Sequence, residues 1–428
     1  MEEETLPYVI VGAGPVGLTL AYGLARRFPS RPIVVLEAAG EPAVGATSRS
    51  YPVYLSPRST QFFDQVGISL AEANTWKNFG VSRNGRPMGR IESLGMARGS
   101  LVGCLMKHCR TLPKVSFQFG KRVGSIVKKD QDKLVCIEFT DGSSPLDASF
   151  VFDCSGCRSA IRKAAIAVGA LTSNVPAVPS NYHVKFLRFA NVPPSLGYDP
   201  DYMHFLRDKN MNGRLQKWGC DGPNAWVLSV DLHSPLAAPY KDETSFDAFA
   251  GAVLKGLPAL LPFVVRSDEM PESVVLSEFW LSEFVWGDNV VFLGDAAHVA
   301  SPIMAQGLNA GLADVRVLLK GLSDGKSISE AAVAYSARQT LEGRALVLTS
   351  NKMSAMIKKP VMLIVLTLLH KLFPSWIHAS PNARLYEEIN VSYDEVWRTW
   401  QSEIEAVKRL LVAVVLILLV LVLRFVRF

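Results

Sequence analysis

An apolar stretch, a glycine-rich turn and a second apolar stretch open the chain. Residues 9–11 are uniformly apolar, which predicts a buried strand, and residues 33–36 repeat that pattern. Between them, leucines and alanines recur over residues 18–24 on one face of a predicted helix. A strand, a helix and a second strand in this order predict a parallel β-α-β unit.

The turn between the first strand and the helix carries three glycines. Gly12 permits a sharp turn, Gly14 lets backbone N–H groups approach a pyrophosphate, and Gly17 allows the helix to pack closely on the strand. The helix N-terminus favours the negative charge of the phosphates. Glu37 lies about twenty residues further on, where it can accept hydrogen bonds from ribose hydroxyls. The predicted nucleotide-binding residues of this unit are Gly12, Gly14, Pro15, Val16, Gly17 and Glu37.

A second strand that ends in glycine lies far downstream. Residues 290–293 are apolar and deliver Gly294 and Asp295 to the carboxyl end of the predicted strand. Pro302 stiffens the following loop, and a helix is predicted from Gly307 onward. An acid and a helix N-terminus are thus again predicted to meet at one ligand.

Together the two segments resemble those of the FAD-dependent aromatic hydroxylases, the single-component flavoprotein monooxygenases. The resemblance implies FAD as cofactor, NAD(P)H and O2 as co-substrates, and a small aromatic substrate. It implies that Asp295 contacts a ribityl hydroxyl and that Pro302 lies beside the reactive edge of the flavin. Leu308 and Asn309 would face the ring, which makes Pro302 and Asn309 the catalytic candidates. The cofactor residues implied for this segment are Gly294, Asp295, Gly307, Leu308 and Asn309.

Five further positions take a role from the same resemblance. Arg49 and Arg98 match arginines that meet flavin phosphates and ribityl oxygens, and Val123 matches a position whose backbone meets the adenine. In family members that act on an aromatic amino acid, Arg90 corresponds to an arginine that binds the substrate carboxylate. Tyr386 corresponds to a tyrosine near the C-terminal wall of the substrate site. The sequence shows no metal-ligand spacing.

Two family landmarks are altered. Ser155 stands where the family carries an acid that helps to organise pyrophosphate and nicotinamide binding, and Ala305 replaces a glycine after the second strand end. The first change also creates a Cys154-x-x-Cys157 pair before a predicted helix, whose N-terminus would stabilise a thiolate. A dithiol oxidoreductase is therefore one alternative, and two small buried residues that fill tight space are the other.

The pattern of polar and apolar residues along the chain, together with the resemblance, predicts an α/β protein. It has a Rossmann-like FAD-binding domain with an inserted antiparallel β-sheet substrate domain, C-terminal helices and a hydrophobic tail. Residues 73–94 are polar and poor in strand patterns, whereas short alternating runs over 175–284 predict half-buried antiparallel strands. The predicted division is FAD-binding domain at 1–72, 95–174 and 285–325, substrate domain at 73–94 and 175–284, C-terminal helical region at 326–407 and membrane anchor at 408–428.

Composition and charge limit the partners and the cellular compartment that we expect for the protein. The 428 residues are 49% hydrophobic, and a net charge of +6 is spread along the chain without a basic block, which argues against nucleic-acid binding. The acidic N-terminus enters the first strand almost at once, so no signal peptide is expected and the catalytic body is predicted to be cytosolic. Six cysteines without a secreted-domain pattern fit a reducing compartment. The oligomeric state is left open.

The C-terminus ends in an unbroken apolar run. Residues 410–423 would span about 21 Å as a helix, less than a hydrocarbon core of roughly 30 Å, although arginine snorkelling lengthens the usable segment. The run is apolar on every face, which favours a membrane anchor over a buried core helix. The expected membrane is the mitochondrial outer membrane or the endoplasmic reticulum. A second apolar segment, 360–373, either rests on the same bilayer or caps a core.

Three functions follow as hypotheses. The first is a membrane-anchored flavin hydroxylase of a small aromatic compound. The second is a monooxygenase or reductase of a lipid or quinone that reaches the site from the bilayer. The third is a flavoprotein without hydroxylase activity, which binds or exchanges thiols through Cys154 and Cys157.

Overall fold

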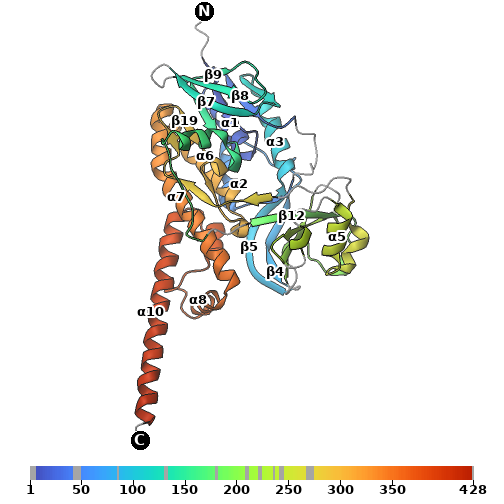
Figure 1. The fold of residues 1–428 in the computed structure, drawn as a ribbon, viewed down its shortest axis with the longest axis vertical. Helices are drawn as coiled ribbons and strands as arrows, with labels where there is room; N and C mark the ends of the chain where they lie inside the picture. Colours follow the sequence, from blue (N-terminus) through green and yellow to red (C-terminus); the bar gives the residue numbers. More distant parts are fainter. Residues whose placement is uncertain are drawn as a thin grey trace, which may run out of the picture.

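The protein is described by a computed structural model that covers residues 6–41, 50–83, 86–129, 134–178, 182–207, 212–219, 224–234, 237–240, 245–266 and 274–426, with the backbone alone at 83, 86, 88–90, 207 and 424–426. It is an α/β fold with two large sheets, a set of packed helices and one helix that projects from the body (Figure 1).

The first large sheet has six strands and is parallel except for its edge strand β18. Parallel strands that are covered on both faces are apolar throughout, and every residue of β1 and of β10 is buried. Helix α1 (Pro15–Arg27) crosses from β1 to β2 and packs between α3 (Arg98–Arg110) and α6 (Gly307–Ser323). In spatial order the strands are β18 (Val285–Trp286), β19 (Val290–Phe292), β10 (Phe150–Asp153), β1 (Tyr8–Val11), β2 (Ile33–Glu37) and β6 (Val115–Phe119).

The second large sheet has eight strands and is antiparallel except where β13 pairs with β4. Helix α5 (Phe246–Leu254) covers one of its faces with a separate apolar core. The strands in order are β16 (Val274–Leu276), β12 (Tyr182–Phe189), β15 (Trp226–Asp231), β14 (Asn212–Lys217), β13 (Tyr202–Arg207), β4 (Trp76–Arg83), β5 (Arg86–Ala97) and β3 (Pro52–Leu55). Residues 73–94, where the sequence predicts few strands, contain β4 and most of β5, so that expectation is wrong.

Two three-stranded sheets and two short helices complete the body. One small sheet flanks the six-stranded sheet, and the other joins the segment after α4 to the loop after β19. The first consists of β7 (Val123–Lys129), β8 (Leu134–Phe139) and β9 (Leu146–Ala148), and the second of β11 (Ser173–Asn174), β17 (Phe279–Leu281) and β20 (His298–Val299). The helices are α2 (Pro57–Val66) and α4 (Ala160–Ala167).

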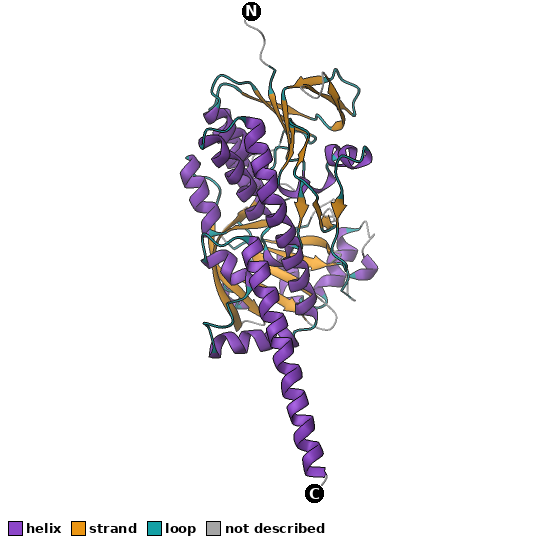
Figure 2. Ribbon diagram, turned by 90° about the vertical axis from the view of Figure 1, so that its left-hand side faces the viewer, coloured by secondary structure: helices purple, strands orange, loops and turns teal. Residues whose placement is uncertain are grey.

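Four helices form the C-terminal part: α7 (Ile328–Lys358), α8 (Val361–Leu372), α9 (Pro381–Glu387) and α10 (Tyr393–Val426). The first half of α10 packs against α7, and its second half leaves the body without any covering element (Figure 2). By length and composition alone, Tyr393–Leu423 is apolar enough to cross a membrane, with a mean hydropathy of 2.9 over an 18-residue window within it. The pair α7 and α8, bent by 103°, also passes that test when counted as one broken span.

Candidate active site

The turn after β1 has the geometry that its glycines predict. Gly12 has a φ of +107°, and a Cβ at this position would lie 2.5 Å from the Cys154 carbonyl oxygen. A Cβ on Gly17 would lie 2.1 Å from the Gly12 carbonyl oxygen. Only glycine fits at both places, and the start of α1 is therefore pressed close to the carboxyl ends of β1 and β10.

Glu37 fixes the end of β2 beside this turn. Its carboxylate accepts hydrogen bonds from the backbone N–H groups of Ala13 at 2.9 Å and Ala39 at 2.8 Å. Each carboxylate oxygen has a further lone pair, which leaves capacity to accept from ribose hydroxyls. A cavity of about 310 Å³ opens here, lined by Gly12, Glu37 and Val123 among others. The cations Lys121, Arg122 and Arg158 also line it, which suits a phosphate-bearing ligand.

Arg98 lies between the two glycine-bearing segments. Its guanidinium is 3.4 Å from the place that a Cβ on Gly14 would take, and it acts electrostatically on Asp295. Its backbone N–H donates to the Tyr51 carbonyl at 2.9 Å, which anchors the start of α3. One guanidinium thus reaches both the phosphate turn and the loop after β19.

The loop after β19 meets the phosphate turn directly. Gly294 and Gly311 both pack on Val16, and a Cβ on Gly311 would lie 2.6 Å from the Val16 side chain. Burial raises the pKa of Asp295, while His298, Arg98 and Arg162 act in the opposite direction. Two segments almost 300 residues apart therefore form one continuous site.

A buried network holds this loop in place. The Asp314 carboxylate accepts from the Gly294 backbone N–H at 2.8 Å, from Gln339 at 2.8 Å, and pairs with His298 Nε2 at 2.9 Å. Burial acts to lower the pKa of His298, but the charge and hydrogen bond of Asp314 raise it above its ordinary value. His298 is engaged inside the protein, which matches a structural role for this residue.

The side chain of Asn309 is bound entirely by other groups of the protein. The side-chain oxygen accepts from the Ser56 backbone N–H at 2.9 Å and the Ser59 hydroxyl at 2.7 Å. The amide nitrogen donates to the carbonyls of Tyr54 at 2.9 Å and Ala305 at 3.1 Å. All four hydrogen-bonding positions of the amide are filled by protein, so this side chain is a positioning group. The backbone N–H of Asn309, in the first turn of α6, is free of intrahelical partners by its position.

A second cavity, of about 180 Å³, lies between this loop and the eight-stranded sheet. Pro302, Gly307 and Leu308 line it from the loop side, together with Asp295. On the sheet side, the cavity is lined by Tyr51, Tyr54, Tyr182, Phe186, Met203, Arg214, Gln216 and Ser229, among others. The cavity is therefore bounded by the predicted flavin loop on one side and by aromatic and polar groups on the other.

Arg214 is the one cation among the described residues that line this cavity. Its guanidinium donates to the Tyr182 hydroxyl at 2.8 Å, and Gln216 on the same face of β14 accepts from the Tyr54 hydroxyl at 2.9 Å. Sequence reasoning missed both residues because an arginine in an alternating strand is usually solvent-facing. The pairing of Arg214 with Gln216 two residues on, at strand period, was the available signal.

The remaining predicted positions are placed as follows. Tyr386 is buried behind the cavity wall, where its hydroxyl donates to the Ala305 carbonyl at 3.4 Å. Arg90 is on β5, but its side chain lies outside the described residues, and so does the whole of Arg49. Among the described residues, no group of three or more His, Cys, Asp and Glu side chains could hold a metal ion.

Asp153 supplies a carboxylate near the altered landmark at Ser155. It accepts from the Ser155 backbone N–H at 3.0 Å and the Ser155 hydroxyl at 2.5 Å, and also from the Ser159 hydroxyl. Burial raises the pKa of Asp153. The loop is thus organised by an acid two residues before the expected position.

The expected stabilised thiolate is wrong. Burial raises the pKa of the Cys154 thiol well above its ordinary value and also raises that of Cys157. Cys154 packs directly under the phosphate turn, with its Cβ 3.2 Å from the place of a Cβ on Gly17. Both thiols are free. These features favour the packing role over dithiol chemistry.

The fold and the site define a dinucleotide-binding flavoprotein. A tight glycine turn at a helix start, an acid at the end of β2 and a second loop that meets the turn through Val16 fit an extended FAD molecule. A family model described as FAD binding domain matches residues 5–347, and the chain belongs to this family. The protein is an FAD-dependent monooxygenase.

Similar proteins cover most of the chain. A kynurenine 3-monooxygenase of Phaeosphaeria nodorum is 25% identical over 448 aligned positions, covering 92% of this chain and 88% of the relative. A para-nitrophenol 4-monooxygenase of a Pseudomonas species is 26% identical, covering 74% of this chain and 78% of the relative. A solved 2-methyl-3-hydroxypyridine-5-carboxylic acid oxygenase shares the fold with a TM-score of 0.66 at 19% identity, covering 89% of this chain and 95% of that one.

Proposed function

We propose that the protein hydroxylates a small aromatic compound that carries an anionic group, with NAD(P)H as reductant and O2 as oxidant. The relatives that act on kynurenine and on para-nitrophenol support an aromatic substrate, as does the aromatic lining of the cavity beside Pro302. FAD, when bound, supplies the redox chemistry of oxygen activation and transfer.

The observation that carries the proposal is the position of Arg214. A guanidinium held in a cavity with three tyrosines is suited to bind a carboxylate or a phenolate through charge-assisted hydrogen bonds. A neutral quinone or lipid would leave that cation without an anionic partner, at a cost in desolvation. An anionic aromatic substrate is therefore favoured over the lipid or quinone alternative. Arg90 on β5 is a second candidate for the same anionic group.

The protein groups have three tasks in this reaction. The backbone N–H groups of Leu308 and Asn309, in the N-terminal turn of α6, would help to hold the flavin ring. Pro302 and Leu308 cover the ring side of the cavity and exclude water. Arg214 and Gln216 orient the substrate against that side, which is a positioning contribution.

Replacing Arg214 with alanine tests the proposal. The apparent KM for an anionic aromatic substrate should rise by roughly ten- to a hundredfold, on the scale of about 1.5–3 kcal/mol for a hydrogen bond to a charged group. Arg214→Lys should recover only part of this, because one ammonium cannot replace a planar fork. The measurement is substrate-stimulated NAD(P)H oxidation together with product analysis. FAD content should not change.

Lys217→Ala is the matched control, because it removes a cation from the opposite face of the same strand. It should leave the KM unchanged. Stimulation by a lipophilic quinone, with none by any anionic aromatic compound, would overturn the substrate proposal. Loss of flavin from Arg214→Ala would instead make Arg214 a structural residue.

We also propose that α10 anchors the protein in the mitochondrial outer membrane or the endoplasmic reticulum, with the catalytic body on the cytosolic side. The support is the apolar run 410–423, whose described side chains are all exposed. Such an uncovered surface is costly in water and favourable in hydrocarbon.

A further inference from the structure

Helix α8 presents apolar side chains on two sides. On the inner side, Leu366 is buried in the C-terminal core. On the outer side, Val361, Ile364, Leu368 and Leu372 are exposed by 73%, 54%, 54% and 70%. These four follow one stripe of a helix with 3.6 residues per turn. A surface helix of a soluble domain carries polar residues on its outer face, whereas the outer face of α8 is apolar.

The corner after α8 extends the same surface. Phe373 and Trp376 are exposed by 52% and 48%, and their rings meet edge to face with centroids 6.5 Å apart. Together with the four residues of the outer stripe, they form what we call the α8 face: Val361, Ile364, Leu368, Leu372, Phe373 and Trp376. Aromatic side chains of this kind are enriched where a protein meets the boundary of a membrane.

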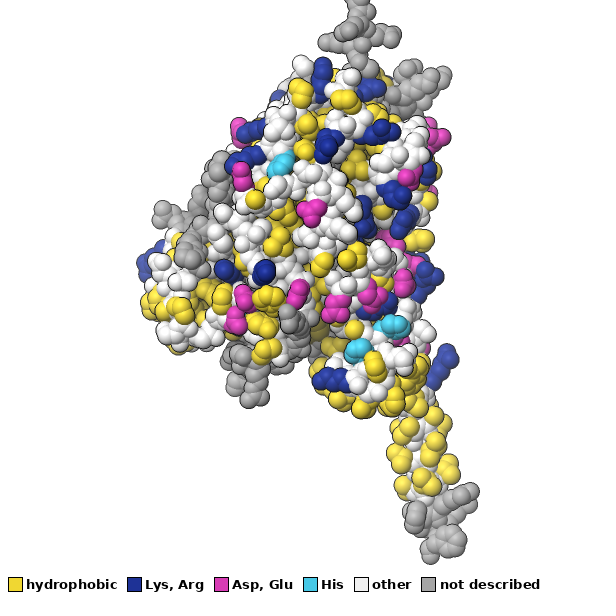
Figure 3. All heavy atoms as spheres, turned by 180° about the vertical axis from the view of Figure 1, so that it is seen from behind, with side chains coloured by type: hydrophobic (Ala, Val, Ile, Leu, Met, Phe, Trp, Pro, Cys, Tyr) yellow, Lys and Arg dark blue, Asp and Glu magenta, His cyan; other side chains and the backbone are white. Residues whose placement is uncertain are grey.

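The α8 face lies at the level where α10 leaves the body. Leu366 shares a core cluster with Val407, and Val407 is the last buried residue among the described side chains of α10. The α8 axis runs crosswise to α10 in Figure 2, in line with the 103° bend between α7 and α8. Hydrophobic side chains gather at this level of the body and continue down the tail in Figure 3. A membrane crossed by the tail would therefore meet α8 lying along its surface.

The sequence segment that carries the α8 face has charged residues of one sign only. No Asp or Glu occurs between Glu342 and Glu387, a stretch that includes Lys358, Lys359 and Lys371. These three lysines are exposed at the two ends of α8. Cations that flank an apolar face attract the anionic headgroups of a bilayer, whereas a protein partner imposes no such uniform sign.

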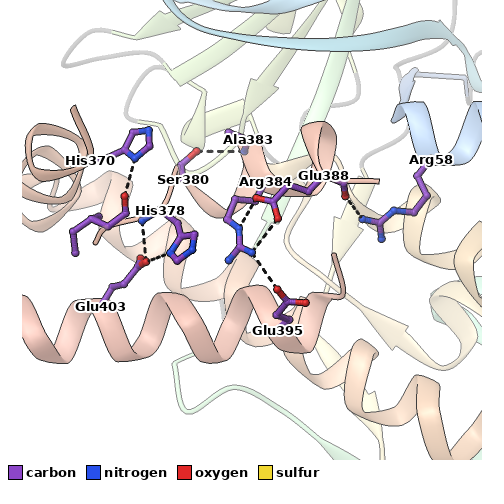
Figure 4. A network of polar contacts seen from close by, with 10 residues as sticks. Arg58, His370, His378, Ser380, Ala383, Arg384, Glu388, Glu395 and Glu403 are labelled. Carbon is purple, nitrogen blue, oxygen red and sulfur yellow. Dashed lines mark hydrogen bonds and ion pairs between the residues drawn. The ribbon is translucent and has the colours of Figure 1, made fainter. Parts of the chain in front are cut away.

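Polar contacts fix α8 relative to α10. The Glu403 carboxylate on α10 accepts from the His378 backbone N–H at 2.9 Å and pairs with His378 Nδ1 at 2.5 Å (Figure 4). His370 near the end of α8 pairs through Nδ1 with the Ile377 carbonyl at 2.8 Å. The corner that bears Phe373 and Trp376 is thus held against α10 rather than left to swing.

We propose that the α8 face inserts into the boundary between headgroups and acyl chains of an anionic bilayer, as a second membrane contact beside the tail. The proposal rests on the anchoring role of α10 proposed above. In this position the apolar side chains of the α8 face contact acyl chains, and the lysines at its two ends contact anionic headgroups. The membrane then holds the catalytic body at two points.

Spin labelling of the full-length protein tests this. The protein is reconstituted in vesicles of phosphatidylcholine and phosphatidylserine, and a nitroxide is attached to Leu368→Cys, Leu416→Cys or Val333→Cys. The unsubstituted chain gives the background from native cysteines. Val333 is the matched control, because it is exposed by 55% on α7, against 54% for Leu368, and it is not part of the α8 face. Flavin absorbance verifies that each variant is folded.

The measured quantity is how often each nitroxide collides with O2, which concentrates in lipid, compared with how often it collides with a water-soluble nickel chelate. We expect the label at position 368 to favour O2 at least severalfold over the label at 333, at a shallower depth than 416. A label at 368 that behaves like 333, while 416 lies deep, overturns the α8 proposal and leaves the anchor intact. A label at 416 in water overturns the anchor itself. Shielding of 368 from both reagents would show a protein partner instead and would also overturn the proposal.

Discussion

Ala305 adopts a backbone conformation that alanine disfavours. Its φ of +52° and ψ of +34° are left-handed, and its carbonyl accepts from Asn309 and Tyr386. The left-handed region costs a residue with a Cβ roughly 1–2 kcal/mol, a cost that glycine would not carry. The strain is maintained because the carbonyl must face these two donors, and they help to shape the flavin loop.

Ala305→Gly should therefore stabilise the protein. Relief of strain is partly offset by the entropy that glycine adds to the unfolded chain, about 0.4–1 kcal/mol, so the expected net gain is roughly 0.5–1 kcal/mol. Denaturant unfolding of the FAD-bound protein measures it. Ala310→Gly, inside α6, should destabilise by about 0.5–1 kcal/mol. Equal destabilisation by both changes would contradict the strain argument.

The roles of some residues could be predicted from the sequence, and the roles of others could not. The roles of Glu37 and Gly17 were predictable because these residues contact Ala13 and Gly12 within one β-α-β unit. Arg214 gains its role only when the eight-stranded sheet closes over the loop after β19, and no local pattern encodes that closure. The role of Asp153 does not follow from the family motif, which has its acid at position 155, because the Asp153 carboxylate reaches Ser155 only through the fold of the loop.

At the scale of elements, the hydrogen bonds of the Asp314 carboxylate connect one strand and two helices. His298 is on β20, Asp314 on α6, and Gln339 of α7 binds the other oxygen of the carboxylate. Because the folded pKa of His298 is raised above 6.5, its pairing adds stability that is fully present below pH 6.5. That stability is lost as pH rises through the folded pKa.

His298→Gln keeps a hydrogen-bond donor but removes the charge. We expect it to lower the free energy of unfolding at pH 6, by up to about 3 kcal/mol, and by a smaller amount at pH 9. Denaturant titrations of both proteins across this range provide the measurement. A loss that is the same at every pH would mean that His298 is neutral in the folded protein.

Elements differ in how well the sequence predicts them. The strands β1 and β19 are apolar throughout, and β2 is apolar up to Glu37, because both of their faces are covered, and periodicity identifies such strands readily. The strands β4 and β5 carry glycines and charged residues, and they pair with each other through two register shifts. Their strand state comes from pairing across the sheet, which composition does not reveal.

At the scale of the molecule, the body and the tail are separable in function. Every predicted flavin-site residue precedes position 310, and the described residues of the tail beyond Val407 contact no core cluster. Removal of residues 408–428 should convert a membrane-bound protein into a soluble or weakly bound one that retains FAD. Carbonate extraction and flavin absorbance of both forms measure this. A full-length protein that is extracted by carbonate would make the tail an oligomerisation or core helix.

The body and the tail nevertheless share one helix. Val396, Trp400, Ile404 and Val407 fix the first half of α10 in the C-terminal core, and the same helix continues without a break into the apolar run. A hydrophobic segment adjusts to bilayer thickness by tilting. No linker separates the tail from the body. If α10 spans a bilayer as proposed, a change in bilayer thickness that tilts the tail would also tilt the catalytic body and its active-site cavity.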